Sequence, residues 1–163
     1  MNEKLKKARE ILENVTPLRT DCGKVCGARC CRSLEGEETG MLLFPGEEEA
    51  YLEKPEWTCR ETGRGILAVC PGRCDRKERP LACRIFPLLP VARNGEIRAA
   101  ADERARKVCP LLRHGVQGLD PAFRSAVKEA GRLLAEDPEQ AAFLAALGEE
   151  QEELKALREK LGG

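Results

Sequence analysis

Residues 70–87, which read CPGRCDRKERPLACRIFP, are the stretch of the chain that decides its fold. The stretch contains Cys70, Cys74 and Cys83, and it shows neither the alternation of a strand nor the 3.6-residue period of a helix. Thiolates are soft metal ligands, and several of them converge only where the backbone turns back within a few residues. We therefore predict a loop shaped by a ligand, and we name residues 70–87 the second cysteine loop.

A first cysteine loop precedes it at residues 17–34, which read PLRTDCGKVCGARCCRSL. Its four cysteines are Cys22, Cys26, Cys30 and Cys31. Glycine follows each of the first two cysteines and lowers the conformational free energy of a tight turn. Cys59 and Cys109 stand alone in the sequence, the latter directly before Pro110. The two loops together predict metal ligation rather than a hydrophobic core as the main organiser of this region.

The length of 163 residues predicts one domain over residues 1–163. Aromatic residues make up only 4% of the chain, so the apolar core is thin for this length and bound metal is expected to help hold it together. The amino terminus lacks an apolar signal segment and no stretch is long enough to span a membrane, which favours a cytoplasmic protein. Because that compartment is reducing and nine cysteines cannot all pair, we do not expect a disulfide framework.

The rest of the sequence predicts a small α+β fold in which these loops and short antiparallel hairpins pack with helices at both ends. Apolar residues at helical spacing predict an amino-terminal helix over residues 3–16, ahead of the metal-binding core at 17–110. Asn94-Gly95 between two apolar runs, 88–92 and 97–101, is a hairpin signal, and 66–69 is expected as the second strand of another hairpin. The pairs Asp120-Pro121 and Asp137-Pro138 start a helical pair within 120–161, which Gly148 is expected to interrupt.

The cysteine pattern resembles a known family. Cys-x3-Cys-x3-Cys-Cys, followed by Cys-Pro-x2-Cys and then by Arg-Pro-x2-Cys-Arg-x-Phe-Pro at 79–87, is similar to the YkgJ-type or CxxCxxCC family, described as a zinc- or iron-chelating domain. The family label implies gaps of two residues where this chain has three. The resemblance implies a metal-ligand set of Cys22, Cys26, Cys30, Cys31, Cys70, Cys74 and Cys83, with Cys109 as an eighth by position and Cys59 as a bystander. It also implies that Arg79 and Arg84 hold the ligating cysteines in place through hydrogen bonds to sulfur or to carbonyl groups.

The choice between metals stays open at this stage. Proline after Cys70 and Cys109 is typical of ferredoxin cluster motifs and favours an iron–sulfur cluster, 4Fe-4S in type, while thiolate ligation serves zinc equally well. Ligation by cysteine alone predicts a closed site with a structural or redox role. His114 is expected to end a helix rather than to bind metal, and the acids of Glu47-Glu48-Glu49 to form a solvated helix start.

The charge distribution along the chain indicates which classes of binding partner to expect. Residues 60–107 carry twelve basic residues against six acidic ones, whereas 35–56 carry eight acids and one lysine, so the net charge of zero is unevenly spread. The zero net charge and few aromatics count against nucleic acid, and we expect an unidentified protein or small-molecule partner. A zinc-dependent interaction module and an accessory or catalytic component of a modification enzyme are the alternatives. The latter follows from a related domain in flagellin lysine N-methylases, and no catalytic constellation supports it.

Overall fold

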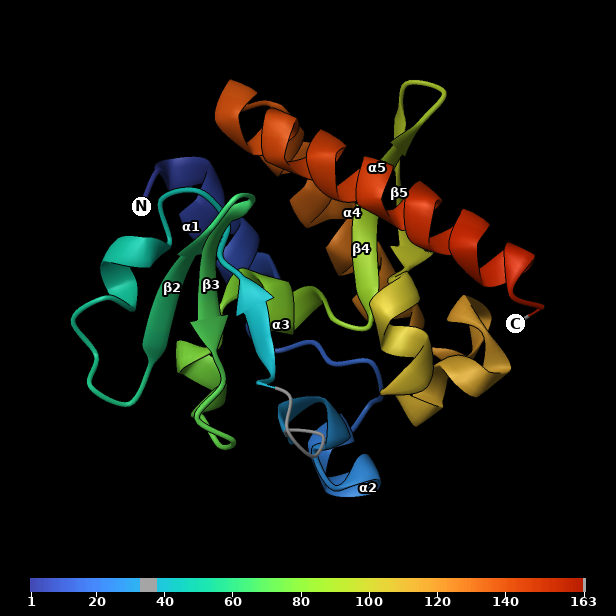
Figure 1. The fold of residues 1–163 in the computed structure, drawn as a ribbon, viewed down its shortest axis with the longest axis horizontal. Coiled ribbons are helices and arrows are strands. Elements are labelled where there is room, and N and C mark those ends of the chain that lie inside the picture. The colour runs from blue at the N-terminus through green and yellow to red at the C-terminus, as the bar shows by residue number, and fades with distance from the viewer. Residues whose placement is uncertain (33–37, 163) are drawn as a thin grey trace.

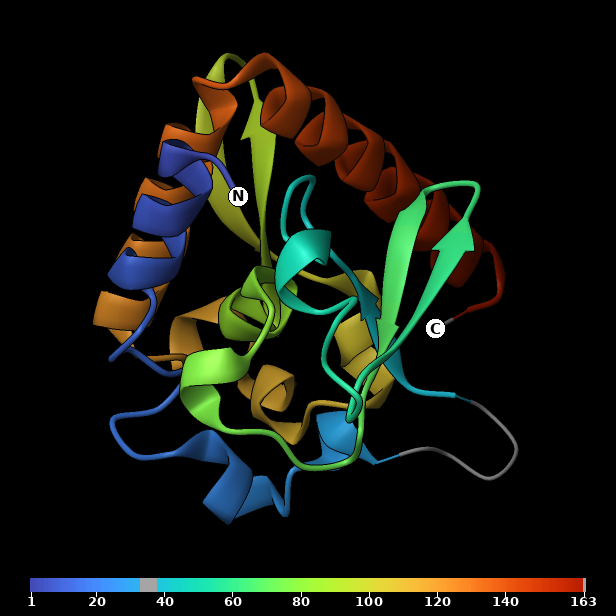
Figure 2. The ribbon, with the colours of Figure 1, turned by 90° about the vertical axis from the view of Figure 1, so that its left-hand side faces the viewer.

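The computed structural model describes residues 1–32 and 38–162, and these form a small α+β fold (Figures 1 and 2). Residues 33 and 34 of the first cysteine loop lie outside the described residues. The helices are α1 (Glu3–Ile11), α2 (Cys22–Cys26), α3 (Leu81–Ile85), α4 (Pro121–Ala135) and α5 (Pro138–Lys160). The strands are β1 (Gly40–Leu42), β2 (Thr58–Thr62), β3 (Gly65–Val69), β4 (Leu88–Arg93) and β5 (Glu96–Ala101). Short 3-10 helices connect several of them.

The strands form two antiparallel sheets. The first has the order β1-β3-β2, with Gly40 opposite Val69 and Thr62 opposite Gly65, so the predicted strand at 66–69 is confirmed as the second arm of a hairpin. The second sheet is the β4–β5 hairpin. Its turn places Asn94 and Gly95 at φ values of 53° and 76°, which is the conformation that Asn-Gly favours in a two-residue hairpin turn. The predicted Asn-Gly hairpin is therefore confirmed.

The carboxy-terminal helical pair is confirmed as well. The Asp120 carboxylate accepts the Ala122 N–H at 2.8 Å, and the Asp137 carboxylate accepts the Gln140 N–H at 3.0 Å, so both aspartates cap the helices that begin at the following prolines. The expected break at Gly148 is wrong, because α5 runs without interruption to Lys160. In Figure 1, α5 crosses in front of the β4–β5 hairpin and α4 lies behind it.

The amino-terminal helix is shorter than the predicted 3–16, because α1 ends at Ile11. The Arg76 side chain from the second cysteine loop binds the segment that follows α1. Its Nε donates to the carbonyl oxygen of Glu13 at 3.0 Å, and its Nη2 donates to that of Val15. The arginine thereby satisfies carbonyl groups that have no helical N–H partner, and Pro17 has no N–H to offer to Glu13. Leu12 still lies in the core, so the apolar period predicts burial correctly past the point where the helix ends.

The main hydrophobic core lies between α1, α3, α4, β4 and the first half of α5. A smaller cluster of Leu43, Tyr51, Trp57 and Ala68 packs beside the three-stranded sheet. The cysteine-bearing helix α2 lies at the opposite end of the molecule from the β4–β5 turn, as both Figure 1 and Figure 2 show. Within the described residues no helix is long and apolar enough to cross a membrane.

Candidate metal centre

Two consecutive left-handed residues shape the first cysteine loop. Asp21 caps α2 by accepting the Gly23 N–H at 3.0 Å, and α2 ends after about one turn at Gly27, whose φ is 65°. Ala28 follows at φ 52° and starts the 3-10 helix Arg29–Cys31. The chain thus reverses between its cysteines, as the glycine after the second cysteine predicts.

The Arg84 side chain holds the second cysteine loop in place. Its guanidinium donates to three carbonyl oxygens, those of Arg79 at 3.0 Å, Arg9 at 3.0 Å and Lys77 at 2.6 Å. Arg9 belongs to α1 and the other two acceptors to the loop itself. Arg84 therefore ties the segment between Cys74 and Cys83 to the amino-terminal helix, and its hydrogen bonds go to carbonyl groups rather than to sulfur.

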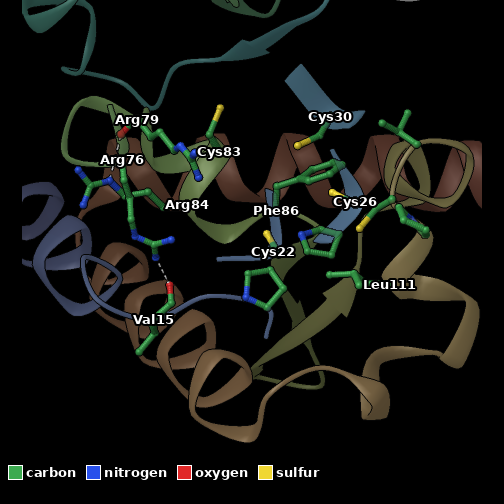
Figure 3. Close-up of a pocket in the computed structure, with 15 residues that line it drawn as sticks. Val15, Cys22, Cys26, Cys30, Arg76, Arg79, Cys83, Arg84, Phe86 and Leu111 are labelled. Carbon is green, nitrogen blue, oxygen red and sulfur yellow. Dashed lines mark hydrogen bonds between the residues drawn. The ribbon is translucent and has the colours of Figure 1, made fainter. Parts of the chain in front are cut away.

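Eight of the nine cysteines line two adjoining cavities. The first cavity, of about 50 Å³, is lined by Cys22, Cys26, Cys30, Cys83 and Cys109. The second, of about 60 Å³, is lined by Cys30, Cys31, Cys70, Cys74 and Cys83. Arg79 and Phe86 line both. Figure 3 shows Cys22, Cys26 and Cys30 around Phe86, with Arg79 and Cys83 to one side. The ninth cysteine, Cys59, lies on β2 beside the smaller apolar cluster and lines neither cavity.

The thiols come together without forming a finished ligand cage. Among residues 1–32 and 38–162, no three His, Cys, Asp or Glu side chains are gathered closely enough to hold a metal ion as they stand. The Sγ atoms of Cys30 and Cys31 are 4.0 Å apart, within reach of a weak S–H hydrogen bond. The described cysteines form no disulfide.

Electrostatic coupling follows the two cavities for most of the thiols, while the contact between Cys30 and Cys31 links the two groups. Burial, followed by the negative charges of Cys26, Asp21 and Cys109, raises the pKa of Cys22 to about 11. The hydrogen bond with Cys30, together with burial, raises the pKa of Cys31 to about 11. These thiols are therefore neutral at physiological pH, and binding of a metal would have to release their protons.

The second group is coupled in the same way. Burial, followed by the charges of Cys31, Cys70 and Cys74, raises the pKa of the Cys83 thiol. The pKa of Cys74 is raised by burial and, to a smaller extent, by Cys70. Cys83 thus interacts electrostatically with the thiols of the second cavity, although it lines both.

Arg79 is the cation shared by both groups. Its guanidinium charge lies close enough to lower the pKa values of Cys22, Cys70 and Cys74, against the effect of burial. Its Nε is buried and has no hydrogen-bond partner among the described residues. A buried donor without an acceptor is costly, and a sulfur atom carrying negative charge would satisfy it.

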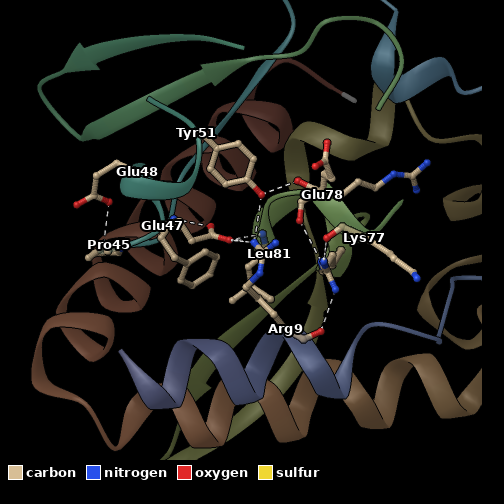
Figure 4. Close-up of polar contacts among 12 residues, drawn as sticks. Arg9, Pro45, Glu47, Glu48, Tyr51, Lys77, Glu78 and Leu81 are labelled. Carbon is tan, nitrogen blue, oxygen red and sulfur yellow. Dashed lines mark hydrogen bonds and ion pairs between the residues drawn. The ribbon is translucent and has the colours of Figure 1, made fainter. Parts of the chain in front are cut away.

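A buried ion pair near the loops is a feature that the sequence reasoning missed (Figure 4). Glu47, expected on a solvated face, is fully buried, so that expectation is wrong. Its carboxylate pairs with the Arg9 guanidinium and accepts the N–H groups of Phe44 at 3.1 Å and Leu81 at 2.9 Å. Tyr51 joins the network, since its hydroxyl donates to the Glu78 carbonyl oxygen at 2.6 Å. The acid of Glu47 thereby fixes the start of α3, the helix that carries Cys83.

His114 ends the 3-10 helix Pro110–His114, and Gly115 follows it with a φ of 69°. This confirms the predicted place at a helix end. The residue is exposed and lines neither cysteine cavity.

Fold and site together define a small α+β protein with two adjoining cysteine-lined cavities. Comparison with protein-family models, with curated proteins and with solved structures finds no match to this chain. The family resemblance of the cysteine pattern therefore stays a prediction.

Proposed function

We propose that the chain is a metal-binding cysteine-cluster protein that carries iron–sulfur clusters, 4Fe-4S in type, with a structural or redox role. The observation that carries the proposal is the gathering of eight thiols around two adjoining cavities. They come from the first cysteine loop, the second cysteine loop and Cys109, which are far apart in the sequence. Cysteines that served only as small apolar residues would have no reason to collect from three segments around shared space.

The proposed ligand sets follow from the cavities and the couplings. Cys31, Cys70 and Cys74 line only the second cavity, and the charge coupling of Cys83 assigns it to that group. Cys22, Cys26 and Cys109 line only the first cavity. Cys30 lines both cavities, and its Sγ atom is 4.0 Å from that of Cys31; we assign it to the first set because the second already holds four thiols. Two sets of four thiolates result, and four is the number that an iron–sulfur cluster or a structural zinc ion requires.

The volume of the cavities favours a cluster. A cavity of about 10–15 Å³ is enough to hold one water molecule. The two cavities measure about 50 and 60 Å³, so each leaves room for several atoms between the thiols. A cluster of several atoms needs more of this space than a single zinc ion at about 2.3 Å from each sulfur. When bound, a cluster supplies one-electron transfer and a covalent cross-link between the loops.

The residues around the cavities suit negatively charged sulfur. Arg79 offers a guanidinium charge to both groups, and its Nε–H, which has no partner among the described residues, is available to one sulfur. Arg84 keeps the second loop attached to α1. Hydrogen bonds to cluster sulfurs and exclusion of water are the usual means by which a protein tunes a reduction potential, and Arg79 and Phe86 are the residues placed to provide them.

Zinc is the second candidate, and one distance favours it. Four sulfurs at about 2.3 Å from a tetrahedral zinc ion are about 3.8 Å apart. The Sγ atoms of Cys30 and Cys31 are separated by 4.0 Å, close to that value. Adjacent cysteines on one zinc ion would make the site a structural module rather than a redox centre.

Anaerobic purification followed by metal and sulfide analysis tests the proposal. We expect brown protein with iron and acid-labile sulfide, and loss of at least one cluster in Cys83→Ser. Cys59→Ser is the matched control and should keep the full complement. Colourless protein that holds zinc would contradict the iron–sulfur cluster and support the zinc site. Anaerobic protein free of both metals, or equal loss in the two variants, would refute the proposal.

A further inference from the structure

A third cavity opens beside the two cysteine cavities. It measures about 380 Å³, within the range of about 300–1,000 Å³ that is common for small-molecule sites. We call it the basic groove, and it is lined by Arg29, Cys30, Arg32, Thr39, Gly40, Met41, Phe86, Arg104, Lys107 and Val108. It shares Cys30 and Phe86 with both cysteine cavities, so a molecule in the groove would lie against the proposed metal centre.

The groove carries a concentrated positive charge. Four of its ten lining residues are arginine or lysine, and no carboxylate lines it among the described residues. Arg104 is the one of the four that is paired, since it binds Asp102 through Nε at 3.0 Å and Nη2 at 2.7 Å. Glu35 and Glu37, close to Arg32 in the sequence, lie outside the described residues.

Within the part of the chain that the structure describes, the remaining three cations lack carboxylate partners. Within residues 1–32 and 38–162, Arg29, Arg32 and Lys107 make no ion pair with a carboxylate. Many other basic residues of the chain do have one, such as Arg60 with Glu38 and Arg93 with Glu152. Three cations without a paired carboxylate among the described residues repel one another in one concave site and raise the local potential for anions.

The remaining walls of the groove are apolar. Met41, Phe86 and Val108 supply them, next to the hydroxyl-bearing Thr39. A ligand that fits therefore has an oxyanion group for the guanidinium and ammonium groups and an apolar or planar body for Phe86 and Met41.

We propose that the basic groove binds a small organic oxyanion, a phosphate ester or a carboxylate with an apolar body, beside Cys30. Apart from Cys30, the residues that line the groove are not proposed metal ligands, so the inference does not require the proposed function. If both hold, the groove gives the metal centre its substrate class.

Isothermal titration of the full-length, anaerobically prepared protein tests this inference. Phenyl phosphate and benzoate are the two anionic probes, and neutral benzyl alcohol is the uncharged one. We expect saturable binding of at least one anion, weakened by added sodium chloride, and no saturable binding of benzyl alcohol. The anion that binds more tightly identifies the phosphate or the carboxylate as the preferred group.

Paired variants locate the binding. Arg32→Gln/Lys107→Gln should weaken the anion at least about tenfold, a loss of about 1.4 kcal/mol. Lys128→Gln/Arg132→Gln, on α4 outside the groove lining, removes the same charge and should leave binding unchanged. Absence of saturable anion binding, equal binding of benzyl alcohol, or equal loss in both double variants would overturn the inference. Metal content measured on the same samples separates the two proposals. Metal without anion binding refutes only the proposed anion site, and anion binding without metal refutes only the proposed metal centre.

Discussion

The buried ion pair between Glu47 and Arg9 permits a quantitative prediction for Glu47→Ala. The carboxylate is fully buried, and its loss strands the Arg9 guanidinium together with the N–H groups of Phe44 and Leu81. Removing one partner of a buried ion pair costs about 3–5 kcal/mol. Each stranded buried donor adds about 1–3 kcal/mol, part of which water entering the new cavity recovers. We therefore expect a loss of about 4 kcal/mol in the free energy of unfolding.

Urea unfolding followed by circular dichroism measures this loss. With a slope of about 2 kcal/mol per molar urea, the midpoint should fall by about 2 M. Glu49→Ala is the control, because the Glu49 side chain is 76% exposed and pairs only with the terminal amino group among the described residues. It should leave the midpoint unchanged. A midpoint for Glu47→Ala that coincides with the control would refute the conclusion that this carboxylate holds α1 and α3 together.

Three further predictions concern packing, pH and metal. In Gly131→Ala a Cβ would lie 2.3 Å from the Cβ of Pro90, so α4 must shift from the hairpin; we expect a loss of about 1–3 kcal/mol, and an unchanged melting temperature would contradict the packing. Burial opposes ionisation of Glu103, but hydrogen bonds from Arg158 and Arg106 outweigh it and hold the Glu103 pKa below its ordinary 4.5. The ionised Glu103 therefore stabilises the fold above pH 4.5, and this stabilisation is lost as the pH falls through the lower pKa of the folded protein. The wild type should accordingly lose more stability in acid than Glu103→Gln. Melting temperatures of the two proteins that fall in parallel with pH would refute this. Chelation should raise hydrogen exchange in the two cysteine loops and leave the β4–β5 hairpin and α4 protected, since these pack on the main core; loss of protection everywhere would show that metal holds the whole fold.

The local parts of the fold could be predicted from the sequence. Asn94-Gly95 and the two Asp-Pro pairs act through the backbone of their own neighbours, so a short window contains the whole physical cause. The same is true of the turns in the first cysteine loop, where Gly27 permits the left-handed conformation.

Contacts between segments distant in the sequence explain which features of the fold and the site were not predicted. The segment after α1 is bound by Arg76, which is more than 60 residues away from the carbonyl groups that it contacts, so the apolar period near the amino terminus does not contain this interaction. Glu47 is buried because Arg9, 38 residues earlier, provides its counter-charge, and nothing in the run of three acids distinguishes it from the half-buried Glu48 and the exposed Glu49. The division of the cysteines between two cavities is likewise a property of the tertiary packing, and the spacing within each loop does not contain it.

The adjacency of Cys30 and Cys31 has a consequence for how the protein would assemble its centres. These residues are consecutive in one 3-10 helix, and each belongs to a different proposed ligand set. Ligation of either one orders the backbone of the other, so the entropy of arranging that segment is lost only once. Filling of the two sites should therefore be cooperative, with half-loaded molecules a minor species at every stage of reconstitution.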